Sequence, residues 1–285
     1  MVLKFTGSFT QQEAIPEKAI DAAIAVMRHG RLHRYNVAPG ETSETVLLEQ
    51  EFANLTGARY CLAVASGGYA LTAALRASGL KQNDIVLTNA FTLAPVPGAI
   101  QGAGGCPVFV EITKDLVLDL DDLKAKIEST NAKFLMLSHM RGHIVDMEAL
   151  LKITDEAGIK VIEDCAHTMG ANWNGITSGR SGIVGCYSTQ TFKHINSGEG
   201  GFLITDDVEI MAKATMLSGS YMLYESHLAG APIEAFENIR LDTPNCSGRM
   251  DNLRAAILRP QLENLSIQAN RWNKRYRKLE NGLNQ

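Results

Sequence analysis

From residue 58 onward, short apolar runs alternate with longer segments whose apolar residues recur at helical spacing. The short runs are rich in branched residues and predict strands, at 60–66, 84–89, 107–112, 133–139, 160–167, 185–190 and 200–206. The amphipathic segments between them predict helices, at 68–79, 94–104, 118–130 and 146–158. Repeated strand–helix–strand units place helices on both faces of a mostly parallel sheet. The pattern therefore predicts an α/β protein with three layers, α/β/α.

The last third of the chain departs from this alternation. Residues 219–248 lack a clean period, and we expect them to form an ordered excursion or flap. A long helix is expected from Asp251 to the end of the chain. Pro260 should kink it, because proline cannot donate the helical hydrogen bond.

Composition and charge narrow the classes of function. Hydrophobic residues make up 45% and charged residues 20% of the 285 residues, as in ordinary globular proteins. The net charge of -4 gives no basic surface for nucleic acid, and no apolar run is long enough to span a membrane. The five cysteines are far apart and form no CxxC pair, so neither a zinc site nor a disulfide framework is suggested. We expect a cytoplasmic protein with no nucleic-acid or membrane partner.

Candidate chemistry lies just after the strands, because ligands of open α/β sheets collect at the carboxyl ends of the strands. Ser66, Gly67 and Gly68 follow the apolar run "CLAVA" and precede a helix. Small residues there let the backbone N–H groups and the dipole of the helix face a phosphate. A tight strand-to-helix turn explains the same three residues equally well.

An acidic residue follows the apolar start of the strand predicted at 160–167. Asp164 follows "KVIE", and His167 comes three residues later. A carboxylate at the end of an apolar strand is costly to bury unless a cation meets it, and a protonated pyridine nitrogen is one such cation. A helix cap or a water-exposed turn is the alternative for Asp164.

A lysine stands beside a glycine-rich turn in "TFKHINSGEGG". Ser188, Gln190 and Lys193 follow a strand there; a serine hydroxyl can bind a phosphate, and the amine of a partly dry lysine can attack a carbonyl. A phosphate cradle, an acid for a ring nitrogen and a lysine for an aldehyde are together what pyridoxal 5'-phosphate requires. We therefore predict this cofactor, with the flexible turn letting Lys193 move on and off it. A surface lysine in a loop is the alternative.

Two histidines have the spacing of a metal-binding pair. His139 and His143 are four residues apart, which on a helix would place both rings on one face. They flank a strand end and a glycine turn, however, so the helical face that such a pair needs is absent. No metal site is predicted.

These motifs resemble those of the DegT/DnrJ/EryC1/StrS family of sugar aminotransferases, which are fold-type I enzymes dependent on pyridoxal phosphate. The most specific piece is "CYSTQTFKHINSGEGGFLIT", and further matches are "VIEDCAHTMGA", "SGGYALTAAL", "SHMRGH" and "GRMDNLRAAILRPQLENL". The resemblance implies the large, cofactor-binding domain of a fold-type I aminotransferase over residues 1–250. It also implies that the helix at 251–285 leads toward a smaller domain that is not among these 285 residues.

Carried over residue by residue, the resemblance makes Lys193 the lysine that binds the cofactor covalently and moves protons. Asp164 would pair with the ring nitrogen, and His167 would lie near the ring as the third catalytic residue. The residues expected to contact the cofactor are Ser66, Gly67, Gly68, Leu93, Asp164, His167, Ser188, Gln190 and Lys193.

Three positions depart from the family pattern. Leu93 stands where an aromatic ring usually stacks on the pyridine, so the π contact is lost. Gly68 replaces the usual threonine of the phosphate cradle, which removes one hydroxyl donor. Arg141 stands where tyrosine is common, which bears on an acidic substrate.

The resemblance implies that an amino group passes from glutamate or glutamine to a keto-sugar, expected to be nucleotide-linked. It also implies a homodimer with shared active sites. Two alternatives stay open: a sugar dehydratase that uses the same cofactor, and a non-catalytic cofactor-binding or regulatory subunit. The dehydratase branch has histidine at the lysine position, so Lys193 favours the aminotransferase.

Overall fold

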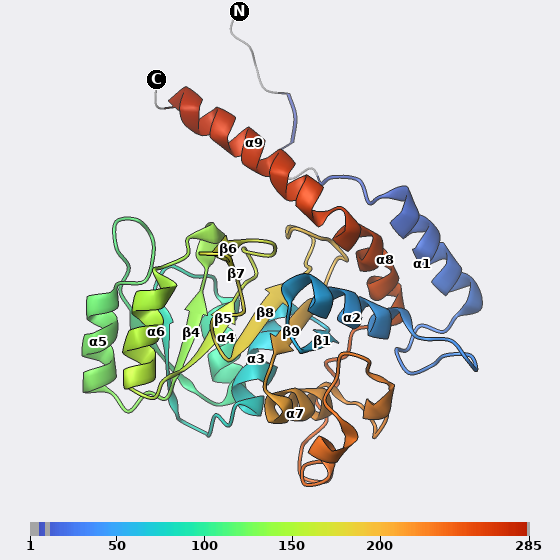
Figure 1. The fold of residues 1–285 in the computed structure, drawn as a ribbon, viewed down its shortest axis with the longest axis horizontal. Coiled ribbons are helices and arrows are strands. Elements are labelled where there is room, and N and C mark those ends of the chain that lie inside the picture. Colours follow the sequence, from blue (N-terminus) through green and yellow to red (C-terminus); the bar gives the residue numbers. More distant parts are fainter. Residues whose placement is uncertain (1–5, 9–11, 284–285) are drawn as a thin grey trace, which may run out of the picture.

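A seven-stranded β-sheet forms the centre of the molecule, which a computed structural model describes over residues 6–8 and 12–283 (Figure 1). The strands are β1 (Tyr60–Val64), β2 (Ile85–Asn89), β3 (Cys106–Val110), β4 (Phe134–Ser138), β5 (Lys160–Asp164), β8 (Val184–Ser188) and β9 (Gly201–Thr205). Their order across the sheet is β1-β9-β8-β5-β4-β2-β3. From β3 to β8 every pair is parallel, whereas β9 is antiparallel to both β8 and β1.

Helices cover both faces of the sheet (Figure 1). On one face lie α3 (Gly67–Ala77), α4 (Pro95–Ala103) and α7 (Val208–Ser218); on the other lie α2 (Glu44–Thr56), α5 (Leu120–Ser129), α6 (Met147–Glu156) and α8 (Asn252–Glu263), with α1 (Glu17–His29) packed on α8. Side chains alternate between the two layers: Leu62 packs with α3, whereas Cys61 packs with α2. The predicted three-layer α/β/α fold with a mostly parallel sheet is confirmed.

The helices begin where the sequence supplies caps. Asp119, Asp146 and Asp207 each accept a hydrogen bond from backbone N–H groups in the first turn of α5, α6 and α7. No helix among the described residues is long and apolar enough to cross a membrane.

Helices α1, α2 and α7 and one hairpin were not predicted. Helices α1 and α2 precede residue 58, and α2 buries polar Thr45 and Glu49 beside its apolar residues, which blurs its periodicity. A two-stranded hairpin, β6 (Asn172–Trp173) and β7 (Ile176–Thr177), turns at Asn174 and Gly175. Both turn residues have positive φ, so the dipeptide Asn-Gly was a usable hairpin signal.

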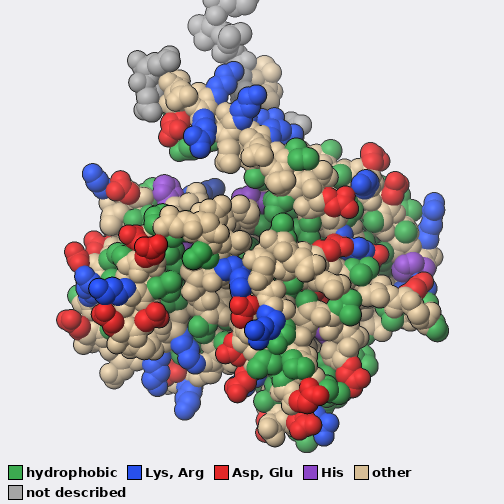
Figure 2. Space-filling view, in the orientation of Figure 1, with side chains coloured by type: hydrophobic (Ala, Val, Ile, Leu, Met, Phe, Trp, Pro, Cys, Tyr) green, Lys and Arg blue, Asp and Glu red, His purple; other side chains and the backbone are tan. Residues whose placement is uncertain are grey.

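The predicted long helix is interrupted, and not at Pro260. Helix α8 ends at Glu263 and α9 (Leu265–Leu283) begins two residues later, with Asn264 between them. The N–H of Asn264 bonds to the carbonyl of Gln261, and its side chain donates to the carbonyl of Pro260 at 3.2 Å, so the helical ladder stops there. Helix α9 runs away from the body and carries basic side chains (Figures 1 and 2).

The excursion after α7 is ordered, as predicted. It contains two 3₁₀ turns, η2 (Tyr224–Ser226) and η3 (Ile233–Phe236). A fully buried ion pair between Arg34 and Glu49, with two contacts of 2.8 Å, meets the ring of His227 and ties the excursion to α2. Backbone bonds from Cys61 and Ala65 of the first strand region also end on this excursion.

Gly201 lies where the turn after β1 meets β8 and β9. A Cβ on Gly201 would lie 2.6 Å from the carbonyl oxygen of Tyr187 and 2.7 Å from the backbone nitrogen of Gly67. We expect Gly201→Ala to lower the free energy of unfolding by ~1–3 kcal/mol, because rigid backbone has to move. Gly98→Ala, in α4 with no atom within 4 Å, should instead raise it by about 0.5–1 kcal/mol. Chemical denaturation measures both, and a Gly201→Ala chain of parental stability contradicts the close contact.

Candidate active site

The nine residues predicted from the sequence line one cavity of about 440 Å³. They follow the carboxyl ends of four strands that run in the same direction, β1, β2, β5 and β8. Leu71, Pro95, Val96, Ser138, Met140, Ala166 and Glu199 complete the lining. The topology thus brings together residues that are up to 127 positions apart, from Ser66 to Lys193. The roles of the nine residues stay predictions.

One wall of the cavity is the N-terminus of α3. Ser66 caps this helix, since its Oγ accepts the N–H of Tyr69 at 3.0 Å. The N–H groups of Gly67 and Gly68 lie in the first helical turn, where no intrahelical acceptor exists. A Cβ on Gly67 would lie 2.8 Å from the Cβ of Ser188, so glycine lets the helix start directly beside the end of β8. The tight turn is therefore present, whereas phosphate binding by this helix end stays a prediction.

Asp164 ends β5 and contributes a carboxylate to the cavity wall. Its Oδ1 accepts the backbone N–H of Ala166 at 3.1 Å, and its Oδ2 accepts the hydroxyl of Ser138 at 2.8 Å. Burial raises the pKa of this carboxyl, and the hydrogen bond from Ser138 opposes the rise. Asp164 does cap a local turn, but a second donor holds it at the cavity.

His167 is half-buried at the same wall. Its Nδ1 accepts the backbone N–H of Arg141 at 2.9 Å, so the proton of the neutral ring resides on Nε2. Burial, followed by the positive charges of Lys193 and Arg141, lowers the pKa of His167 to about 4. The ring is therefore neutral near pH 7. Arg141 adopts a left-handed conformation with φ of 56° to make this contact.

Lys193 reaches the cavity from the segment between β8 and β9. Its amine has no hydrogen bond or ion pair with any residue in the described part of the chain. Burial lowers the pKa of Lys193, the carboxylate of Asp164 acts in the opposite direction, and the guanidinium of Arg141 lowers it further. A larger fraction of this amine is neutral, and thus nucleophilic, than in a surface lysine.

The backbone around Lys193 is tied together by hydrogen bonds, and the predicted movement of this turn stays a prediction. Residues 189–200, here called the lysine segment, are closed by bonds from the N–H of Thr189 to Gly200 and from the N–H of Thr191 to Gly198. The side-chain oxygen of Gln190 accepts the N–H of Phe192 at 3.0 Å, so Gln190 caps the turn that presents Lys193.

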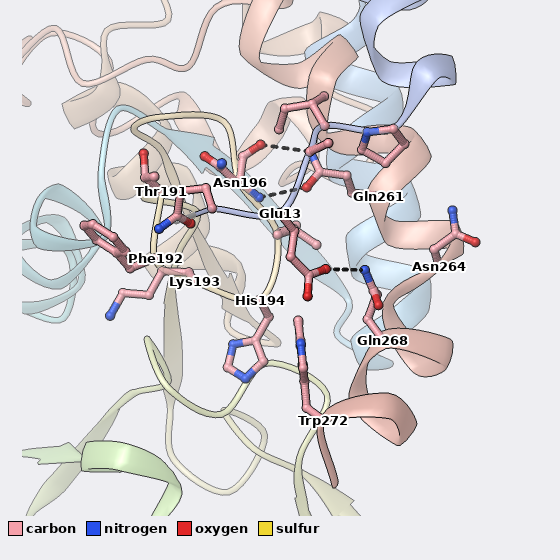
Figure 3. A pocket seen from close by; sticks show the side chains of 15 residues that line it. Glu13, Thr191, Phe192, Lys193, His194, Asn196, Gln261, Asn264, Gln268 and Trp272 are labelled. Carbon is pink, nitrogen blue, oxygen red and sulfur yellow. Dashed lines mark hydrogen bonds between the residues drawn. The ribbon is translucent and has the colours of Figure 1, made fainter. Parts of the chain in front are cut away.

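The far side of the lysine segment is bound to α8 and α9 (Figure 3). The side chain of Gln261 accepts the N–H of Asn196 at 2.9 Å and donates to its carbonyl at 2.8 Å. His194 lies edge-on to Trp272, with ring centroids 5.6 Å apart. In Figure 3 the side chains of Lys193 and His194 leave the segment on different sides. Neither contact was predicted, because each joins residues more than sixty positions apart.

A buried polar cluster braces the end of β5 behind the cavity. The ring of His139 bonds to Glu163 at 2.9 Å. One ring nitrogen of His139, one carboxylate oxygen of Glu163 and the Sγ of Cys165 lie within 4.8 Å of one another. Burial acts to raise the pKa of Glu163, but bonds from His139 and from backbone N–H groups such as that of Gly182 outweigh it. Three such N–H groups donate hydrogen bonds to the carboxylate of Glu163, which also bonds to His139. His143 is exposed and does not join the cluster.

A family model describes almost the whole chain. The model of the DegT/DnrJ/EryC1/StrS aminotransferase family matches residues 14–285. The chain belongs to this family. The resemblance found in the motifs around Lys193 and Asp164 is thereby confirmed, although the match does not test the role of any single residue.

Two relatives and one solved structure indicate what this chain is similar to. A pleiotropic regulatory protein of Geobacillus stearothermophilus is 32% identical over 81% of this chain and 58% of its own length. A dTDP-3-amino-3,4,6-trideoxy-alpha-D-glucose transaminase of Micromonospora megalomicea is 32% identical over 76% of this chain and 55% of its own length. The crystal structure of DesV from S. venezuelae in complex with a ketimine intermediate matches with a TM-score of 0.73 at 29% identity, over 88% of this chain and 62% of that one. The chain thus spans less than two thirds of each.

Gln261 offers a test of how the lysine segment is held. Gln261→Ala removes both bonds to Asn196, and we expect the segment to lose ~1–3 kcal/mol of local stability because partly buried backbone groups lose their partner. Amide hydrogen exchange of residues 189–200 should accelerate accordingly. Gln268→Ala is the matched control, since among the described residues the side chain of Gln268 bonds only to the exposed Glu13. Equal exchange in the two variants would show that Gln261 does not hold the segment.

Proposed function

We propose that this protein binds pyridoxal 5'-phosphate and acts as an aminotransferase. The amino donor is glutamate or glutamine, and the acceptor is a keto-sugar that carries a nucleotide. The observation that carries the proposal is the shared cavity: the amine of Lys193, the carboxylate of Asp164 and the N-terminus of α3 all line it. An amine, an acid and an anion site are the three groups that this cofactor requires.

The residues present fit the cofactor. Gly67 and Gly68 leave the first turn of α3 free of side chains, and a Cβ on Gly67 would enter the space beside Ser188. The hydroxyl of Ser188 and these N–H groups suit a phosphate. Asp164 accepts one hydrogen bond at each oxygen and keeps lone pairs for a further donor. The cavity of about 440 Å³ has room for the ring.

When bound, pyridoxal phosphate supplies an aldehyde carbon and an electron-withdrawing ring. Lys193 supplies a nucleophilic amine and afterwards a base that moves a proton at Nζ. The negative charge of Asp164 favours a protonated ring nitrogen. His167, neutral and holding its proton on Nε2, offers a donor at the same wall.

The relatives support the substrate class. The Micromonospora transaminase is named for a dTDP-linked amino sugar, which supports a nucleotide-linked acceptor here. The neighbouring DesV structure holds a ketimine, which supports amino transfer. Because the chain spans only part of these proteins, the activity of the whole protein is inferred by analogy as well as from the cavity.

We extend the proposal to assembly, domains and location. Leu93 lines the cavity and is 44% exposed, and Phe192 beside Lys193 is 67% exposed, which supports a second subunit that covers the site. The partner is a second copy of this chain, each completing the active site of the other. Residues 1–250 form the cofactor-binding domain, and α8 and α9 lead toward a smaller one. The protein resides in the cytoplasm.

The half-reaction with the amino donor tests the function. We expect Asp164→Asn to keep the fold and some cofactor, while single-turnover transfer from glutamate or glutamine falls by several decades, because the ring nitrogen loses its anionic partner. Glu199→Gln is the matched control, since Glu199 lines the same cavity but is exposed. The cofactor's visible absorbance follows the reaction. A decrease of less than about tenfold, worth roughly 1.4 kcal/mol, would contradict the role of Asp164.

Measurements of amino transfer also distinguish the aminotransferase from the two alternatives, a non-catalytic regulatory subunit and a sugar dehydratase. A chain that binds the cofactor through Lys193 but exchanges no amino group with either donor supports the regulatory subunit. Lys193→His reproduces the residue of the dehydratase branch and should abolish transamination. A parent chain that removes a hydroxyl from a keto-sugar instead of aminating it supports the dehydratase.

A further inference from the structure

Ser138 is a polar residue that lines the cavity and was not among the candidates predicted from the sequence. It is the last residue of β4 and the register partner of Asp164, the last residue of β5. Because the two strands are parallel, paired residues point to the same side of the sheet. The hydroxyl of Ser138 donates to Oδ2 of Asp164 at 2.8 Å, and Ser138 is 5% exposed.

Ser138 is itself fixed by the side chain of Asn89, the last residue of β2. The backbone pairs between β2 and β4 end at Thr88 and Met136. Beyond them, Asn89 Oδ1 accepts the N–H of Ser138 at 2.9 Å, and Asn89 Nδ2 donates to the carbonyl of Ser138 at 3.1 Å. The amide therefore continues the ladder that the two backbones no longer make. A third bond, to the carbonyl of Phe91, leaves Asn89 little freedom.

We propose that Ser138, held in place by Asn89, is a positioning residue for Asp164, which orients its carboxylate at the cavity and stabilises its anionic form. The importance of this for catalysis rests on the proposed cofactor function. The hydrogen bond itself does not, because it joins two side chains of this chain. Ala166 binds the other carboxylate oxygen through its backbone. A substitution at Ser138 therefore changes one of the two bonds that fix the carboxylate and leaves the other in place.

The titratable groups that face Asp164 determine in which direction a substitution at Ser138 shifts the pKa of Asp164. Two side chains act on Asp164 from different elements, His139 just after β4 and Lys193 in the lysine segment, and both lower the pKa of Asp164. The thiols of Cys165 and Cys186 adjoin it, but burial raises the pKa of each well above its usual range, so they stay neutral. The fifth neighbour is Glu163, whose carboxylate is hydrogen-bonded to His139 and to backbone N–H groups.

Loss of the Ser138 hydroxyl should therefore raise the pKa of Asp164. Burial already raises it, and the bond from Ser138 is the largest of the effects that oppose burial. With the donor gone, the carboxylate takes up a proton at higher pH. Any property that needs the anion, including affinity for a protonated ring nitrogen, is then lost at a higher pH as the solution is acidified.

The test uses Ser138→Ala and Ser138→Thr in the full chain, with two readouts. The first is the titration of the Asp164 carboxyl in the cofactor-free protein, followed by carbon NMR. The second is the pH dependence of the dissociation constant for pyridoxal phosphate. We expect Ser138→Ala to move both curves to higher pH and to weaken binding at the acid end by roughly tenfold, about 1.4 kcal/mol. Ser138→Thr, which keeps the hydroxyl, should restore the parental curves.

Thr88→Val is the matched control. Thr88 is buried on β2 and its hydroxyl has no partner among the described residues, so its loss removes a similar group without touching Asp164. If Ser138→Ala does not fold, Ser138→Cys keeps the volume and weakens the donor. Titration of Asp164 at the same pH in the parent and in the folded Ser138 variant would overturn the inference. A parent chain that binds no cofactor refutes the proposed function instead, and the NMR titration still decides the role of Ser138.

Discussion

The structure depends on one close contact, between the turn after β1 and the ends of β8 and β9. A side chain on Gly67 would collide with Ser188, and a side chain on Gly201 would collide with the backbone of Ser66 and Gly67. Only glycine lets α3 begin directly against the sheet. Because of this contact, the N-terminus of α3 opens onto the same cavity as Asp164 and Lys193.

Burial then changes the chemistry of the groups that this contact gathers. It raises the pKa of Asp164 and lowers the pKa values of Lys193 and His167, so that each group is shifted toward its neutral form. Only some of these groups have a hydrogen bond that opposes the effect of burial. The hydroxyl of Ser138 stabilises the anion of Asp164, whereas the amine of Lys193 has no hydrogen bond with the described residues. The site thus combines a supported carboxylate with an amine that is free to react. That combination suits a cofactor with a basic ring nitrogen and an aldehyde.

The sequence predicted the features that depend on local periodicity and on the residues at strand ends. Branched apolar runs located the strands of the large sheet, and the rule that ligands collect at carboxyl ends led to Asp164 and Lys193. It did not reveal contacts between distant segments, such as Gln261 with Asn196, since nothing near either residue signals the other. Ser138 was within reach, because it lies next to the end of the strand predicted at 133–139. The sequence also did not reveal the interruption at Asn264, whose side chain bonds to the carbonyl of Pro260.

The most direct test of the central claim is to locate the covalent bond between chain and cofactor. The protein loaded with pyridoxal phosphate is reduced with borohydride and digested, and the modified peptide is identified by mass spectrometry. We predict a single pyridoxyl adduct on Lys193 and no adduct in Lys193→Ala, whose cofactor should dissociate on dialysis. An adduct on another lysine, or equal labelling of the Lys193→Ala variant, would contradict the account.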